Sequence, residues 1–412
     1  MAIQILQTLG QLRLAAQLAE KLLPQAIHYE LTETCLSLLS IVKHEAASVQ
    51  GDAALFEQHT QLYNHYQETH RLENVAITYY EKIRLNFVKS LAPKPALAVE
   101  AHTYYTELLP YLSKYTSHRL HLFVRTLQIS EALIKCDYPA VLELSRVSIL
   151  FFLQKLFLHQ RALSLFYNHQ LIACIHLKQY DIGWEASRQC LQLEREGGHN
   201  WYVFLSRQIQ LALHCGAYQK GLQSFIQGWE HKRFKQQSPI IVENWWVFQA
   251  YFFFLHSIGQ LNDVKKYEAL QNFRLQRFLN NTPNLQKDKQ GMNLAILIVQ
   301  ILILTVERKY NEAIDRIEAI EMYTYRHLHK QSPLYRVNHF IKALLELPKA
   351  GFHPVAFQRK AETVWKKLQL ARPEQSSHHN EIEILPFEQI WEFLLGILIE
   401  QRSKKNSKNE LV

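Results

Sequence analysis

The stretch Tyr202–Trp229 reads YVFLSRQIQLALHCGAYQKGLQSFIQGW, and the assignment of the fold starts from its pattern. Apolar residues recur at steps of three and four on both sides of a short turn at Cys215–Ala217. That spacing places the apolar side chains of each segment on one face of a helix. The stretch therefore predicts two amphipathic helices joined by a tight turn.

The same local pattern occurs four times in the chain. A glutamine is followed by an aliphatic residue, and a tyrosine stands ten positions after the glutamine: Gln128-Ile129 with Tyr138, Gln170-Leu171 with Tyr180, Gln208-Ile209 with Tyr218, and Gln300-Ile301 with Tyr310. A fifth unit keeps the ten-residue spacing, with Tyr251 in place of the glutamine and Leu261 in place of the tyrosine. Self-similarity over several tens of residues is typical of a stacked array of helical hairpins.

Small residues follow each tyrosine, at Ala140, Gly183, Gly221 and Ala313. Small side chains at these points permit neighbouring helices to cross closely. The pattern resembles the tetratricopeptide family over about residues 119–320. The matching units are Tyr218, Gly221, Phe225 and Gly228, then Tyr310, Ala313 and Ile317, and then Tyr180, Gly183 and Cys190 with Ser187 in the bulky position. The chain departs from the family where Leu171, Ile209 and Ile301 replace its small residue in the first helix.

This resemblance implies an all-α fold, a right-handed α-solenoid of stacked helix-turn-helix repeats with a terminal capping helix. We expect an N-terminal helical region at 1–92, a repeat array at 93–371, a loop and capping helix at 372–401, and a basic disordered tail at 402–412. A long helix over 52–91 is expected to break near 70–74. The array opens either with a shortened cap or with a part of the chain that lies upstream.

Composition agrees with a helical protein. Hydrophobic residues make up 48% of the 412 positions, whereas glycine and proline number only 12 each, too few for the turns of a large sheet protein. Five widely spaced cysteines indicate packing residues in a reducing cytoplasm rather than a disulfide framework. The most apolar run, Leu294–Val306, is too short to span a bilayer, so no membrane association is expected.

The chain lacks the usual signatures of catalysis. Its 21 histidines include His118 and His121 at helical spacing, but no metal-binding motif occurs and no cysteine stands at ligand spacing. The pair Gly197-Gly198 follows acidic residues and does not suit phosphate. We therefore predict no catalytic residue, no cofactor and no metal, and we expect the protein not to be an enzyme.

Two features have both a structural and a functional interpretation. The repeated glutamines either bond to neighbouring helices inside the stack or present amides to a ligand. The aromatic run Trp245–Phe254 either fills the core between repeats or lines a groove, with Lys265, Lys266, Arg274 and Arg277 downstream as a basic stripe. The best candidates for contact with a partner are Arg207, Gln210, Trp245, Trp246 and Gln249.

The resemblance implies a non-catalytic scaffold that binds a partner protein or peptide in the concave face of the array. A net charge of +9 keeps open a nucleic-acid-binding helical repeat, which requires a connected positive stripe. A third alternative is the regulatory subunit of an enzyme carried on another chain. The sequence leaves the oligomeric state and the identity of the partner open.

Overall fold

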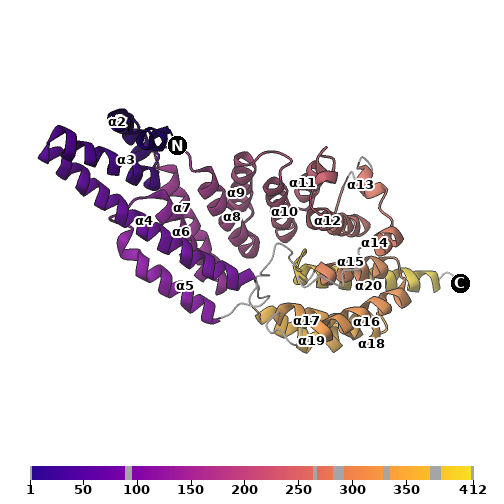
Figure 1. The fold of residues 1–412 in the computed structure, drawn as a ribbon. Coiled ribbons are helices and arrows are strands. Elements are labelled where there is room, and N and C mark those ends of the chain that lie inside the picture. The colour runs from indigo at the N-terminus through magenta and orange to yellow at the C-terminus, as the bar shows by residue number, and fades with distance from the viewer. Residues whose placement is uncertain are drawn as a thin grey trace. The chain divides into compact units, whose positions relative to one another are not determined.

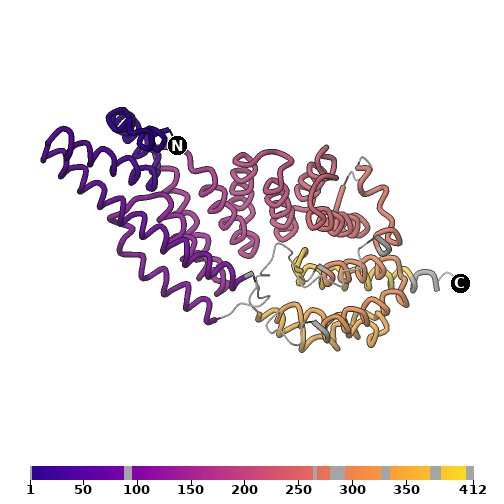
Figure 2. Tube along the Cα trace, in the orientation of Figure 1, coloured from indigo at the N-terminus to yellow at the C-terminus, as the bar shows by residue number. Residues whose placement is uncertain are grey.

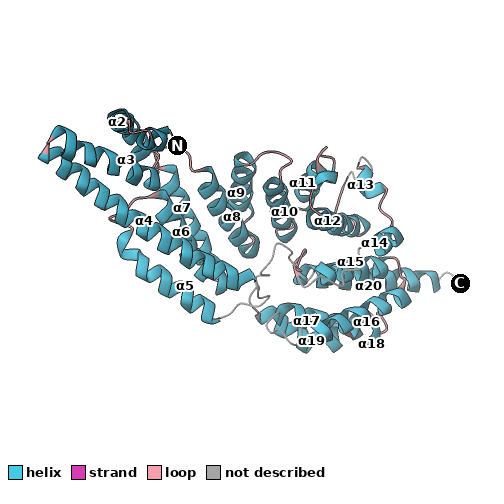
Figure 3. Ribbon diagram, in the orientation of Figure 1, coloured by secondary structure: helices cyan, strands magenta, loops and turns pink. Residues whose placement is uncertain are grey.

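The computed structural model describes residues 2–88, 95–262, 267–281, 292–327, 335–371 and 382–409. The chain divides into two compact units. Unit 1 comprises Met1–Asn86, Pro95–Glu131 and Val147–Leu163, and unit 2 comprises Phe87–Lys94, Ala132–Arg146 and Ser164–Val412. Within the described ranges the regular structure is entirely helical and contains no strand (Figure 3).

The first eleven α-helices follow one another along the chain (Figure 1). Their bounds are α1 (Ala2–Thr8), α2 (Leu12–His28), α3 (Thr32–Glu45), α4 (Ala53–Val88), α5 (Pro95–Leu108), α6 (His118–Ile134), α7 (Tyr138–Leu153), α8 (Gln160–Leu177), α9 (Tyr180–Leu193), α10 (His199–His214) and α11 (Tyr218–Trp229). A π-helical turn at Ala46–Gln50 ends the α3 segment, and a 3₁₀ turn at Leu109–Tyr111 follows α5.

The remaining helices belong to unit 2, and the Cα trace in Figure 2 follows their order. They are α12 (Pro239–Ser257), α13 (Glu268–Gln271), α14 (Leu275–Asn281), α15 (Met292–Val306), α16 (Tyr310–His327), α17 (Tyr335–Leu344), α18 (Glu346–Lys349), α19 (Pro354–Leu370) and α20 (Phe387–Asn409), with a 3₁₀ turn at Phe234–Gln236 before α12. Helices that are adjacent in sequence pack in pairs, among them α2 with α3, α10 with α11, and α15 with α16.

One turn geometry joins six of these helix pairs. A residue with positive φ stands two positions before the second helix, and the next backbone N–H donates to the carbonyl five residues earlier, as Ala217 does to Ala212 over 2.8 Å. This arrangement satisfies carbonyls that a helix end otherwise leaves without partners. The positive-φ residues and the helix starts are Gly10 and Leu12, Glu30 and Thr32, Cys136 and Tyr138, Lys178 and Tyr180, Gly216 and Tyr218, and Arg308 and Tyr310.

In all four repeated units the tyrosine is the first residue of the second helix, in agreement with the predicted helical hairpins. The fifth unit differs, because no helix begins at Leu261. The helix α12 ends with the same turn at Gly259, but Leu261 is buried in the core and the Asn262 N–H donates to the side chain of Gln219. Residues 261 and 262, which follow this turn, are therefore not helical.

Close helix crossings confirm the role expected of the small residues. A methyl group at Gly183 would lie 2.7 Å from Cβ of Cys174, which is closer than non-bonded carbons approach. Since Gly183 is on α9 and Cys174 on α8, these two helices cross at backbone contact. Gly228 on α11 is equally confined by Trp245 on α12.

The glutamine of the central unit is a buried structural amide. Gln208 on α10 donates to Oγ of Ser187 over 2.7 Å and accepts from Oγ of Ser224 over 2.9 Å. It thus links α9 and α11 through α10, which confirms the structural interpretation at this position. Gln300 is also buried, but its Oε1 has no partner among the described residues.

The aromatic run on α12 fills the core of unit 2, as the structural interpretation predicts. Phe248, Tyr251, Phe252 and Phe254 are buried, and the Tyr251 hydroxyl donates to the Ala295 carbonyl on α15. The helix α15, which contains the apolar run Leu294–Val306, contributes fully buried side chains to the same cluster. None of the described helices is long and apolar enough to cross a membrane.

A buried ion cluster fixes the last helices of unit 2. The Arg336 guanidinium on α17 contacts Glu383 over 2.8 Å and Glu388 over 2.9 Å, and it also donates to the Leu368 carbonyl on α19. The helix α20 carries the expected apolar residues but continues to Asn409, beyond the predicted end of the capping helix at 401. The predicted loop at 372–381 lies outside the described residues.

One helix in unit 1 contradicts the prediction of a break. The helix α4 runs without interruption from Ala53 to Val88, although residues 70–74 are mostly polar. Glu73 in this segment is fully buried, and its Oε1 accepts hydrogen bonds from Thr32 and Ser117. Long-range partners thus stabilise a polar helical turn that looks like a loop in the sequence.

Candidate functional site

The five residues predicted to contact a partner do not share one surface. Trp245 is 0% exposed, and its indole Nε1 donates to the Phe225 carbonyl over 3.2 Å. Gln210 is only 6% exposed on α10, where Arg207 is half-buried. Trp246 and Gln249 are also half-buried, and together they line a cavity in unit 2.

This cavity, which we call the Trp246 cavity, has a volume of about 380 Å³. That lies near the lower end of the range of about 300–1,000 Å³ for small-molecule sites. It is formed where the end of α11 and one face of α12 meet the short helices α13 and α14. The lining residues are Trp229, Glu230, Trp246, Gln249, Glu268, Ala269, Asn272, Phe273, Arg274, Arg277 and Phe278.

Aromatic rings form the apolar part of the lining. Trp229 packs against Phe234 with ring centroids 5.1 Å apart, and Phe273 packs against Phe253 at 4.4 Å and Phe278 at 5.7 Å. These contacts fix the rings in place, so the apolar wall exists before any ligand arrives. Preformed walls lower the ordering cost of binding.

Polar groups complete the lining. Gln249 Nε2 donates to the Ala269 carbonyl over 2.6 Å and ties α12 to α13. Arg274 Nη1 donates to the carbonyls of Gln271 and Phe273, both over 2.9 Å. Its other guanidinium nitrogens have no hydrogen-bond partner within the described part of the chain and can donate to a ligand. Arg277 is exposed on α14. The lining contains two arginines and two glutamates, so its formal net charge is zero.

The basic stripe expected downstream of the aromatic run is only partly described. Lys265 and Lys266 lie outside the described residues. Arg274 stands between two short helices and Arg277 on the second, so one continuous helix does not carry them. The structure nevertheless brings both arginines to the same cavity as Trp246.

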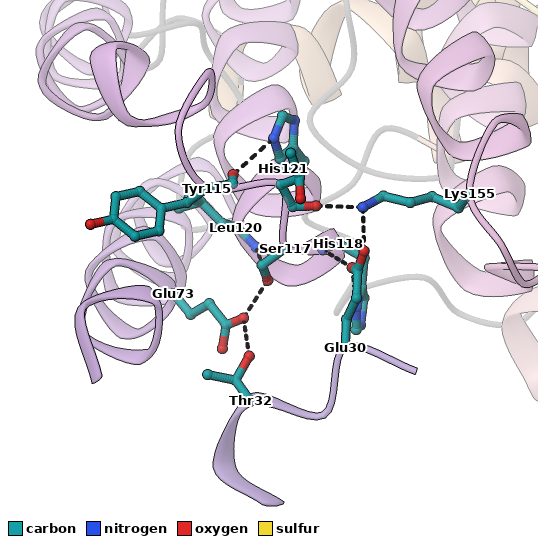
Figure 4. A network of polar contacts seen from close by, with 10 residues as sticks. Glu30, Thr32, Glu73, Tyr115, Ser117, His118, Leu120, His121 and Lys155 are labelled. Carbon is teal, nitrogen blue, oxygen red and sulfur yellow. Dashed lines mark hydrogen bonds and ion pairs between the residues drawn. The ribbon is translucent and has the colours of Figure 1, made fainter. Parts of the chain in front are cut away.

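A second candidate, which we call the Glu30 cluster, lies in unit 1 (Figure 4). Glu30 Oε1 accepts from Lys155 Nζ over 2.5 Å, and Glu30 Oε2 accepts from the backbone N–H of His118 over 2.6 Å. Nδ1 of His118 stands 3.2 Å from the same oxygen, and Lys155 also donates to the Thr116 carbonyl. Burial raises the pKa of Glu30, but the bonds from His118 and Lys155 outweigh it and hold the pKa at about 2.

His159 completes this cluster. Its ring lies against that of His118, with centroids 4.4 Å apart and an angle of 31° between the planes. Burial, followed by the proximity of His118, lowers the pKa of His159 to about 4. One nitrogen from each imidazole and one oxygen of Glu30 all lie within 4.8 Å of one another. Among the described residues, this is the one group of three or more such side chains with metal-ligand spacing.

Sequence reasoning missed this cluster because its members are distant in the chain. Glu30 and His118 are 88 residues apart. The suggested pairing of His118 with His121 does not occur, since His121 Nε2 contacts the Tyr115 carbonyl at 3.2 Å and its ring stacks on Phe151. Comparison with known proteins gave no match to a family model, a curated protein or a solved structure.

Proposed function

We propose that this protein is a non-catalytic scaffold, a right-handed α-solenoid of tetratricopeptide-like hairpins that binds a segment of a partner protein. The repeated turn before Tyr138, Tyr180, Tyr218 and Tyr310 supports the array. The Trp246 cavity is the observation on which the binding proposal rests, because it joins fixed aromatic walls to two arginine side chains.

The chemistry of the lining favours a particular peptide. Fixed aromatic rings favour an apolar or aromatic side chain that leaves water. Arginine guanidinium groups bind carboxylates through paired hydrogen bonds. We therefore propose that the ligand is a peptide segment with an apolar anchor residue beside an acidic residue or a terminal carboxylate.

The balanced charge of the lining supports this choice over nucleic acid. A phosphate backbone is held by several cations in a row, and its affinity falls steeply with salt. At the Trp246 cavity, Glu230 and Glu268 offset Arg274 and Arg277. A short peptide with one carboxylate needs only one arginine and is less affected by the nearby glutamates.

Peptide display on the purified chain tests the proposal. We expect enrichment of sequences that place a large apolar residue next to Asp or Glu. Anisotropy titrations with a selected peptide then compare Trp246→Ala and Arg277→Glu with the unchanged protein. Each substitution is expected to weaken binding by about tenfold or more, because each removes a direct contact of the anchor or the carboxylate.

The matched control is Arg359→Glu, which makes the same charge change at an exposed position on α19 outside the cavity. Its affinity should stay within about twofold of the unchanged protein. Selected peptides that bind Arg277→Glu as tightly as the unchanged protein would show that the cavity is not the site. Tighter binding of a single-stranded oligonucleotide, with a steep salt dependence, would favour the nucleic-acid alternative instead.

A further inference from the structure

We propose that Glu30, His118 and His159 form a binding site for a divalent transition-metal ion of the Zn²⁺ class. Two imidazoles and one carboxylate make a donor set that suits Zn²⁺, which accepts nitrogen and oxygen ligands at about 2.0–2.2 Å. The three donor atoms lie within 4.8 Å of one another, close enough for one ion to reach them all after small side-chain movements. This inference does not depend on the proposed function.

One ring nitrogen of His159 distinguishes this cluster from a group of side chains held only by hydrogen bonds and ion pairs. His159 is 9% exposed, and its Nε2 is buried with no hydrogen-bond partner among the residues that the structure describes. Buried polar atoms almost always have a partner, so an unsatisfied ring nitrogen needs an explanation. A metal ion would supply the missing bond, because a neutral imidazole nitrogen is a good ligand for it.

The backbone holds all three side chains at helix termini. Glu30 occupies the positive-φ position of the turn between α2 and α3. His118 is the first residue of α6, and His159 stands immediately before α8. A metal ion here would tie three segments of unit 1 that are far apart in sequence, as structural zinc ions do in other proteins.

The surroundings favour a cation. The Phe157 ring centroid lies 4.0 Å from that of His159 and 6.0 Å from that of His118, and Phe152 contacts His159 from another side. An apolar shell excludes water and strengthens the attraction between a carboxylate and a cation. The ammonium group of Lys155, 2.5 Å from Glu30, opposes a second cation at this carboxylate unless it moves away.

Lys155 makes a specific consequence of the proposal testable. Its ammonium group must leave Glu30 Oε1 before a metal ion binds there, and the flexible lysine stem allows this movement. Lys155 and the metal therefore compete for the same carboxylate. Removing the ammonium group with Lys155→Met should strengthen metal binding. If the cluster only stabilises the fold through its hydrogen bonds and ion pair, no variant should bind metal.

The experiment is calorimetric titration of the chelator-treated full-length chain with Zn²⁺, followed by Co²⁺ titration read by absorption. We expect one ion per chain, a loss of affinity of at least about tenfold in His159→Ala, and a gain of about tenfold in Lys155→Met. His339→Ala, at a half-buried histidine of α17 in unit 2, is the control and should bind as the unchanged protein does.

X-ray absorption of the Zn²⁺-loaded, unsubstituted protein keeps the test decisive if a variant fails to fold. We expect nitrogen and oxygen ligands with the scattering pattern of two imidazoles. Absence of stoichiometric binding, sulfur ligands from the five cysteines, or binding that is unchanged in His159→Ala would each overturn the proposal.

Discussion

Replacing Gly228 by alanine tests the close helix crossings in unit 2. A Cβ at this position would lie 2.4 Å from Cζ2 of Trp245 and 3.0 Å from Cδ2 of Leu205. Neither the backbone nor the indole can move away easily. The Gly228 carbonyl accepts from the Tyr202 hydroxyl over 3.0 Å, and the fully buried Trp245 is hydrogen-bonded to Phe225.

Two terms of opposite sign set the size of the effect. Forcing an extra methyl group into a packed core costs about 1–3 kcal/mol. Alanine in place of glycine inside a helix contributes about 0.8–1 kcal/mol in the other direction. Because the contact at 2.4 Å is far inside the van der Waals limit, the steric cost belongs near the upper end. We expect Gly228→Ala to lower the free energy of unfolding by about 2 kcal/mol.

Gly396→Ala is the matched control, since Gly396 lies within α20 and, apart from its own helix backbone and chain neighbours, no described atom is within 4 Å of a Cβ at that position. This substitution should raise the free energy of unfolding by about 0.5–1 kcal/mol through helix propensity alone. The two variants differ only in the steric term, so their stabilities should differ by about 3 kcal/mol.

Urea unfolding followed by tryptophan fluorescence is the assay, because all seven tryptophans lie in unit 2. The midpoint should move to lower urea for Gly228→Ala and to higher urea for Gly396→Ala, with unchanged slopes. Equal stabilisation by both substitutions would refute the reasoning, since it would mean that α11 and α12 do not cross at Gly228.

Three further predictions concern unit 2 and use the same fluorescence assay. Burial, followed by the charge of Arg207, lowers the pKa of His169 to about 4, so below pH 6.5 the unfolded chain binds more protons than the folded one. The free energy of unfolding should therefore fall by up to about 3 kcal/mol from pH 7 to 4. His169→Phe should flatten this fall, and an unchanged pH profile in that variant would contradict the assignment. Arg336→Met should lower the free energy of unfolding by about 3 kcal/mol, because it leaves the carboxylates of Glu383 and Glu388 without their cation. Adding Glu383→Gln and Glu388→Gln to this variant should recover most of the loss, and no recovery would mean that the ion cluster is not its cause. Lys178 has a φ of 55°, so Lys178→Gly should raise the free energy of unfolding by about 1 kcal/mol, while Gly216→Ala at the equivalent turn position should lower it by a similar amount. A change of the same sign in both variants would rule out a common turn geometry.

Local patterns predicted the helical hairpins well because their causes are local. A helix of three turns shows its apolar face within its own sequence, and the turn before Tyr180 or Tyr218 depends on only a few neighbouring residues. Gln208 was equally accessible to prediction, since an amide flanked by apolar residues in a buried helix needs partners on neighbouring helices.

Features that depend on distant residues could not be predicted in this way. Residues 70–74 look like a break because the partners of Glu73 are 41 and 44 residues away. The Glu30 cluster joins three segments that local spacing cannot relate to one another. The helices α13 and α14 have only four and seven residues, too few to give a clear periodic pattern, so the walls they add to the cavity were not foreseen.

Trp245 and Trp246 illustrate why the sequence could not separate core from surface on α12. The helix is apolar all round, so its periodicity does not identify a single buried face. Adjacent residues on a helix point about 100° apart, and two different neighbours therefore decide their roles. Gly228 on α11 leaves room for the indole of Trp245, whereas Trp246 turns toward a lining shared with the short helices α13 and α14. The absence of a side chain at one position thus determines which of two identical residues is available to a ligand.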